Sequence, residues 1–204
     1  MNALAHSLAH TTSSHALHAL AARAFARAEP DNANVLIVPG LRGSGEAHWQ
    51  SWLHAQLPGS QRVEQADNTT PDLAAWSDRL GAAIDAAREP VWIVAHSFGS
   101  LASLHASVGR EERIAGLLLV APADPDKFGV RERLPTQMLD IPAILVASSN
   151  DPWMTLDKAR GLAHQLGLSF LNLGAVGHVN TDSGHGPWPQ GLALLRRLQA
   201  AVTA

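Results

Sequence analysis

The ten residues at positions 91–100, VWIVAHSFGS, constrain the fold of this chain more than any other stretch. The first four are apolar and rich in β-branched side chains, which predicts a short buried strand. A helix-like apolar run follows directly after Gly99. The connection is so short that the residues two before and two after Ser97 must be small, and they are Ala95 and Gly99. The stretch therefore predicts a strand, a sharp turn and a helix, with the hydroxyl of Ser97 exposed at the turn.

This context is the one that the nucleophile motif G-x-S-x-G requires, with Ala95 in place of the first glycine. In such a turn the backbone N–H of Phe98, at the start of the helix, can donate to an oxyanion. The alternative is an ordinary strand-to-helix connection in which Ser97 only caps the helix. A serine nucleophile also needs a base and an acid, so the rest of the chain decides between the two interpretations.

Length and composition indicate one globular domain. The chain has 204 residues, of which 46% are hydrophobic and 16% charged, enough to bury a core. The net charge is -3 and no run of Lys or Arg occurs, which argues against a nucleic-acid partner. The chain has no cysteine, so disulfides, a thiolate nucleophile and cysteine-based zinc sites are excluded.

The first 33 residues differ from the rest, because they are rich in Ala and His. They lack the basic start and continuous apolar core of a secretory signal, and no apolar run reaches the roughly 18 residues that span a bilayer. We therefore expect a cytoplasmic protein without a membrane partner. His6 and His10 are four apart and could face one metal ion on a helix, but no carboxylate completes a site. We predict a mobile or loosely docked extension, with no metal, before a domain at residues 34–204.

Short apolar strands alternate with helices throughout that domain. Strands are expected at 35–38, 61–65, 91–94, 116–120, 143–147 and 169–173, and helices at 46–56, 71–87, 155–166, 189–201 and after Gly99. The alternation predicts an α/β fold: a mostly parallel sheet of about six strands, covered by helices on both faces. In such a sheet the active site lies outside the carboxyl ends of the strands.

A histidine that could activate Ser97 follows the last strand. His178 stands in the loop directly after that strand, and His185 lies seven residues further on, in a glycine-rich stretch. Histidine suits the role because its pKa of about 6.5 lets it accept and return a proton near neutral pH. We favour His178 as the base and keep His185 as the alternative.

An acid must hold the imidazole in the correct tautomer. Asp151 follows the strand at 143–147, whereas Asp124 and Asp126 follow the preceding strand, and Asp182 lies close to His178 in sequence. We favour Asp151, which would give the chain order Ser, Asp, His that hydrolases with a G-x-S-x-G turn show.

The loop after the first strand should supply the second oxyanion donor. Gly40 allows a close approach, which makes the N–H of Leu41 the best-placed group. The loop lacks the G-K-[ST] ending of a phosphate-binding loop and the G-x-G-x-x-G pattern of a dinucleotide site, so we expect no cofactor. His96 should shape the substrate pocket. Trp153 and Trp188 either wall that pocket or pack in the core.

Three segments together resemble the small single-domain serine hydrolases of the retinoblastoma-binding protein 9 and YdeN type, within the α/β-hydrolase superfamily. The segments carry G-S-G-x-x-H-W, A-H-S-x-G and G-H-x-N-x-x-S-G-x-G-x-W-P. The resemblance covers about residues 35–198 and implies Ser97 as nucleophile, Asp151 as acid and His178 as base. Vertebrate relatives bind a tumour-suppressor protein through a motif containing cysteine, and this chain has none.

Two functions follow for testing. The first is a serine hydrolase that cleaves esters or amides through an acyl-enzyme, and the second is a binding module on the same fold. Only residues 121–141 separate two neighbouring strands at the point where larger relatives insert a lid. We therefore expect no full cap domain, a shallow pocket, and a small ester or amide substrate with a short acyl chain.

Overall fold

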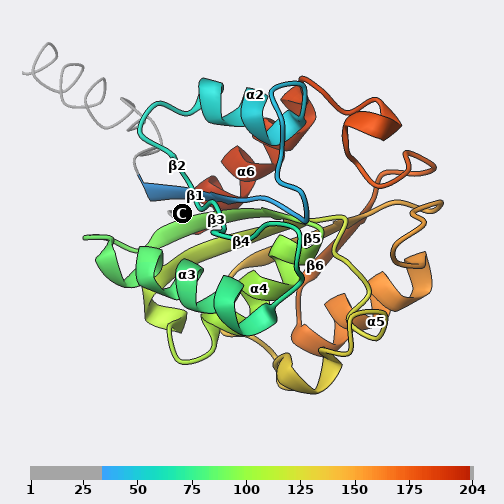
Figure 1. The fold of residues 1–204 in the computed structure, drawn as a ribbon. Coiled ribbons are helices and arrows are strands. Elements are labelled where there is room, and N and C mark those ends of the chain that lie inside the picture. The colour runs from blue at the N-terminus through green and yellow to red at the C-terminus, as the bar shows by residue number, and fades with distance from the viewer. Residues whose placement is uncertain (1–33, 203–204) are drawn as a thin grey trace, which may run out of the picture. The chain divides into compact units, whose positions relative to one another are not determined.

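A six-stranded parallel sheet forms the centre of the domain in the computed structural model, which describes residues 34–202 (Figure 1). The strands are β1 (Val35–Val38), β2 (Gln61–Arg62), β3 (Val91–His96), β4 (Ile114–Val120), β5 (Ala143–Ala147) and β6 (Ser169–Asn172). They are arranged in the order β2-β1-β3-β4-β5-β6, and every neighbouring pair is parallel. The prediction of an α/β fold with a parallel sheet of about six strands is confirmed.

Five α-helices cover the two faces of this sheet, as predicted. They are α2 (Trp49–Gln56), α3 (Leu73–Ala86), α4 (Phe98–Ser107), α5 (Leu156–Leu166) and α6 (Pro189–Val202). Helices α2 and α6 lie over one face, and α3, α4 and α5 lie over the other (Figure 1). Each layer buries its own apolar cluster against the strands, one around Trp76 and Leu101 and the other around Trp49 and Leu195. The sheet is therefore buried on both faces, which explains why its inner strands are almost entirely apolar.

Capping side chains set the starts of two helices later than the apolar pattern indicated. Helix α2 begins at Trp49 and not near residue 46, because the side chain of His48 accepts a hydrogen bond from the N–H of Gln50. Helix α3 begins at Leu73 and not at residue 71, because Asp72 accepts from two backbone N–H groups of the first turn.

Strand β2 is also shorter than predicted, at two residues instead of five. It lies at the edge of the sheet and pairs only with Leu36 and Ile37 of β1. An edge strand with one neighbour has half of the ladder hydrogen bonds that fix an inner strand.

The segment between β4 and β5 contains one short 3₁₀ turn, Arg131–Arg133, and no α-helix. The expectation that no full cap domain covers the carboxyl ends of the strands is therefore confirmed. Within residues 34–202, no helix has both the length and the apolar character needed to cross a bilayer. The predicted N-terminal extension, with His6 and His10, lies outside the described residues.

The turn between β3 and α4 is held in an unusual backbone conformation. Ser97 has φ 53° and ψ -124°, a region that residues with a side chain rarely adopt. The end of β1 packs so closely against this turn that a Cβ on Gly99 would lie 2.7 Å from the carbonyl oxygen of Val38 and closer still to that of Pro39. A Cβ on Gly40 would lie 2.8 Å from the Cβ of Ser97. Glycine is therefore required at both positions, because the end of β1 and the turn after β3 leave no room for a side chain.

Replacing Gly99 with alanine should destabilise the fold, because its new methyl group would meet backbone atoms that cannot move aside. We expect Gly99→Ala to lower the free energy of unfolding by roughly 1–3 kcal/mol, as overpacking in a core does. Gly161→Ala in α5 is the matched control, since nothing lies within 4 Å of the added Cβ there. It should raise the free energy of unfolding by about 0.5–1 kcal/mol, because alanine favours a helix interior. Urea unfolding of both variants measures the difference, and equal effects would contradict the close-contact explanation.

Candidate active site

The three side chains predicted for a catalytic triad form one hydrogen-bonded chain. The Nε2 of His178 lies 2.8 Å from the Oγ of Ser97, and the Nδ1 of His178 lies 2.9 and 3.0 Å from the two carboxylate oxygens of Asp151. Ser97 follows β3, Asp151 follows β5 and His178 follows β6. Because the strands are parallel, their carboxyl ends meet at one edge, which brings together residues 81 and 27 positions apart.

This geometry fixes the tautomer of the imidazole. An ionised carboxylate only accepts hydrogen bonds, so the Nδ1 of His178 carries the proton that Asp151 accepts. The Nε2 is then an acceptor, and the hydroxyl of Ser97 donates to it. The side chains of His178 and Asp151 are 8% and 3% exposed, which keeps competing water away from this hydrogen bond. The arrangement can pass a proton from the serine to the imidazole.

The alternative role for Ser97, as an ordinary helix cap, is wrong. Ser97 stands at the N-cap position of α4, but its side chain makes no capping hydrogen bond. Its hydroxyl is directed to His178 instead. The strained backbone of the turn is what points it there.

The side chain of Asn150 joins the loops that carry Asp151 and His178, a role that the sequence analysis did not predict. The side-chain oxygen of Asn150 accepts from the N–H of Gly177 at 2.7 Å and from the hydroxyl of Ser148 at 2.9 Å. The bond to Gly177 ties the loop of His178 to the loop of Asp151, and the bond to Ser148 holds the Asn150 side chain within its own loop. Asn150 adjoins the acid in sequence, yet nothing local shows that its partner lies 27 residues away.

Two side chains from distant parts of the sequence hold the backbone carbonyls of His178 and Val179. The Nε2–H of His96 donates to the carbonyl oxygen of His178 at 2.9 Å, and the indole N–H of Trp49 donates to that of Val179 at 2.8 Å. His96 was predicted to shape the pocket, and it lies on the pocket wall. It also holds the loop of His178 in place.

The predicted oxyanion donors lie on two segments next to Ser97. Leu41 belongs to a tight turn closed by a hydrogen bond from Gly43 N–H to Gly40 carbonyl, 3.0 Å, and Phe98 is the first residue of α4. The amides of a first helical turn have no partner within the helix, so the N–H of Phe98 is available to a ligand. The side chain of Phe98 is turned away into the core, where it packs against Trp76 and Phe128.

Gln50, another residue that the sequence analysis missed, joins the loop after β1 to the sheet. Its side-chain amide is fully buried and donates to the carbonyl oxygens of Val38 and Val94, at 3.1 and 3.2 Å, on neighbouring strands. Its side-chain oxygen accepts from the hydroxyl of Ser44 at 2.6 Å. A buried glutamine in a helix gives no local sign that it bridges two strand ends, so only the tertiary structure reveals the role.

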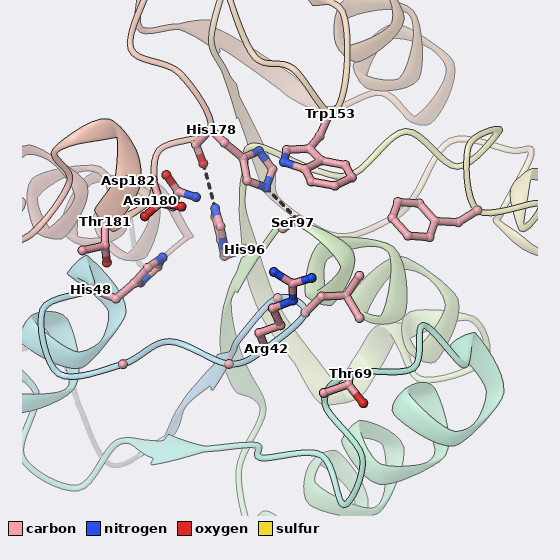
Figure 2. A pocket seen from close by; sticks show the side chains of 15 residues that line it. Arg42, His48, Thr69, His96, Ser97, Trp153, His178, Asn180, Thr181 and Asp182 are labelled. Carbon is pink, nitrogen blue, oxygen red and sulfur yellow. Dashed lines mark hydrogen bonds between the residues drawn. The ribbon is translucent and has the colours of Figure 1, made fainter.

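A pocket of about 370 Å³ opens above Ser97. Figure 2 shows the residues around it, which come from the ends of the six strands and the loops that follow them. One part of the wall is apolar, with Leu41, Phe128 and Trp153, and another part is polar, with Thr181 and Asp182.

The two tryptophans predicted as pocket walls have different positions. Trp153 lines the pocket, and 48% of its surface is exposed. Trp188 does not line it, so the pocket role predicted for this residue is not supported. It is buried just before the start of α6, and it packs edge-on against Trp49 of α2 with ring centroids 5.1 Å apart.

The alternative base and acids lie elsewhere. His185 has its ring edge against Trp188. Asp124 is buried and pairs with Lys158 at 2.6 Å, and Asp126 pairs with the same lysine at 2.8 Å. Asp182 is exposed on the rim of the pocket. Of the carboxylates in the described part of the chain, Asp151 is the one bonded to His178.

Within residues 34–202, no three His, Asp or Glu side chains gather in a way that could hold a metal ion.

Comparison with known proteins gives one family match and many structural matches. A family model for serine hydrolases matches residues 35–197. A protein described as a YdeN-like hydrolase from Pectobacterium atrosepticum is 35% identical, with a TM-score of 0.80; the match covers 83% of this chain and 91% of that one. The ydeN gene product of B. subtilis is 22% identical with a TM-score of 0.69, over 81% of this chain and 98% of its own.

A more distant match shows the fold alone. Mouse alpha/beta hydrolase domain-containing protein 10 is 12% identical with a TM-score of 0.62, over 83% of this chain and 89% of its own. No curated protein matches the chain by sequence. The structural matches confirm the α/β-hydrolase fold, and with the family model they confirm the predicted resemblance to hydrolases of the YdeN type.

Two buried histidines beside the triad are held in the neutral form. Burial, with a smaller contribution from Arg62, lowers the pKa of His48 from its usual 6.5 to about 4. Burial also lowers the pKa of His96 well below its usual value. The neutral form of His48 is needed for structure too, because its Nδ1 must accept the hydrogen bond that caps α2.

These shifts predict that acid weakens the fold before it protonates the carboxylates. When the pH falls below about 6.5, the unfolded chain takes up protons on these histidines and the folded chain does not, so stability falls until the folded pKa is reached. Between pH 7 and pH 5 we expect His48 to contribute a loss on the order of 1–2 kcal/mol in the free energy of unfolding. Urea unfolding at both pH values measures it. His48→Asn keeps a capping oxygen without titrating there, so an unchanged pH dependence in that variant would contradict the assignment.

Proposed function

The chain belongs to the serine hydrolase family, and from that premise we propose that it cleaves small ester or amide substrates through an acyl-enzyme intermediate. The observation that carries the proposal is the continuous hydrogen-bonded chain from Ser97 through His178 to Asp151. All three side chains are nearly buried, and Ser97 and His178 line the pocket, which is where a nucleophile and its base are required.

In the first step, the Oγ of Ser97 forms a bond to the substrate carbonyl carbon while its proton passes to the Nε2 of His178. The carbonyl π electrons move onto the oxygen, which becomes an oxyanion facing the N–H groups of Leu41 and Phe98. Asp151 stabilises the imidazolium through the Nδ1–H hydrogen bond. These fixed dipoles need no reorganisation as the charge develops, which is why such donors lower the barrier.

In the second step, the oxyanion collapses and the bond to the leaving oxygen or nitrogen breaks. The Nε2–H of His178 donates its proton to the leaving group, which departs as an alcohol or amine. Water then gives a proton to His178 as its oxygen attacks the acyl-enzyme. The second oxyanion collapses, the acid is released, and Ser97 regains its proton. The steps use only groups of this chain and one water molecule.

The size of the pocket supports a small substrate. Its volume of about 370 Å³ lies near the lower end of the usual range for ligand sites, about 300–1,000 Å³. The segment between β4 and β5 adds no helical cap above it. A long acyl chain would extend beyond the pocket into water and gain little of the roughly 0.8 kcal/mol that each buried CH₂ provides.

A serine-reactive probe tests whether the site is active. A fluorophosphonate should label the wild-type protein, and Ser97→Ala should abolish both labelling and ester hydrolysis, with a loss in kcat on the order of 10⁶. Ser100→Ala is the matched control, because Ser100 is a buried serine of α4 whose hydroxyl has no hydrogen-bond partner. It should keep both properties. An unlabelled wild-type protein would favour the alternative, a binding module on a hydrolase fold.

Variants of two aspartates can distinguish the acid of the proposed triad from a carboxylate that only stabilises the fold. Asp151→Asn should lower kcat by about 10⁴, because an amide in place of the carboxylate favours the wrong imidazole tautomer. Asp124→Asn should reduce stability through its ion pair with Lys158 while the rate stays near that of the wild type. Steady-state kinetics and urea unfolding of both variants measure the two effects. The reverse result would assign the acid to the loop after β4.

A further inference from the structure

Arg42 occupies a backbone position that glycine would fill more easily. It is a central residue of the turn closed by Gly43 N–H and Gly40 carbonyl, and its φ is 66°. A side chain is disfavoured at this φ, where turns usually place glycine. The conformation is fixed by a hydrogen bond of 2.7 Å from the N–H of Arg42 to the carbonyl oxygen of Asn68. Strain of this kind is found at functional sites.

The side chain at this strained position belongs to the pocket. Arg42 is exposed, and it lines the pocket together with Ser97 and His178. Figure 2 shows its guanidinium pointing into the pocket, toward Ser97. Over residues 34–202, no carboxylate forms an ion pair with it. The pocket therefore contains a positive charge with five hydrogen-bond donors, and within the described part of the chain no carboxylate neutralises it.

The position of Arg42 indicates whether its charge faces the acyl part or the leaving group of the substrate. The leaving group must depart next to the Nε2 of His178, which gives it a proton. In Figure 2, His178 and Arg42 approach Ser97 from opposite sides. The guanidinium therefore faces the acyl half. Asp182, the carboxylate of the pocket wall, lies with Thr181 away from Arg42 in the same view, so an anion beside Arg42 avoids it.

We propose that Arg42 binds a carboxylate at the end of the acyl chain, so that the preferred substrates are monoesters or monoamides of short dicarboxylic acids. This inference rests on the proposed hydrolase function. A guanidinium matches a carboxylate because its planar fork can donate two parallel hydrogen bonds. The arginine is exposed, so the preference should be moderate and should weaken as salt is added.

The test compares two p-nitrophenyl esters of the same shape. One is the hemisuccinate, and the other is the 4-methylpentanoate, whose branched end replaces the carboxylate. The ratio of their kcat/KM values, anionic over neutral, should fall about tenfold from wild type to Arg42→Gln, mainly through KM. Arg42→Lys keeps the charge but loses the planar fork, so its ratio should fall between those of the wild type and Arg42→Gln. Arg79→Gln removes the same charge from an exposed position of α3 outside the pocket, and it should leave the ratio near that of the wild type.

A fourth variant separates the side chain from its strained backbone. Arg42→Gly should lose the preference for the hemisuccinate and also raise the urea midpoint, because glycine adopts the turn without strain. An equal ratio in wild type, Arg42→Gln and Arg42→Gly would overturn the inference while leaving hydrolysis itself established. A wild-type protein that cleaves neither ester and resists the fluorophosphonate would instead overturn the proposed function, and the role of Arg42 with it.

Discussion

The close approach of the end of β1 to the turn after β3 is the contact on which the site depends. A Cβ on Gly99 would stand 2.7 Å from the carbonyl oxygen of Val38, and a Cβ on Gly40 would stand 2.8 Å from Ser97. That approach holds Ser97 at a φ of 53° and brings the turn of Leu41 beside it. The packing of β3 between two apolar strands stabilises the sheet enough to maintain this local strain.

The site also depends on polar side chains that hold backbone groups at the ends of the strands. Gln50 bridges the carbonyls of β1 and β3, Asn150 joins the loops after β5 and β6, and His96 holds the carbonyl of His178. Parallel strands diverge where they end, so their last backbone groups lose ladder partners. Buried side chains supply the missing partners, because an unpaired buried carbonyl or N–H is costly. The same bonds that satisfy the strand ends therefore fix the loops that carry Ser97 and His178.

The sequence predicted those parts of the molecule that depend on local pattern and on chain order. Apolar runs revealed the strands, and parallel strands bring their carboxyl ends together, so Ser97, Asp151 and His178 could be named before their contacts were known. The sequence pattern did not predict features that depend on contact with a residue far away in the sequence. Trp188 follows a loop like Trp153 does, but contact with Trp49 buries it. Helix starts were displaced because His48 and Asp72 cap them, and the bridging role of Gln50 required two strands to be placed side by side.

The histidines around the base connect stability with the proposed chemistry. The rings of His96 and His178 have centroids 4.9 Å apart, and those of His48 and His96 5.0 Å apart. In the proposed mechanism, a positive charge on either neighbour would repel the imidazolium that forms on His178 when Ser97 attacks. Burial prevents this, because it lowers the pKa of both neighbours and keeps them neutral while the base works. The same shifts make the fold sensitive to acid, because both rings bind protons readily in the unfolded chain. In the proposed mechanism, the positive charge that forms on His178 is then balanced by Asp151 without repulsion from its two neighbouring rings.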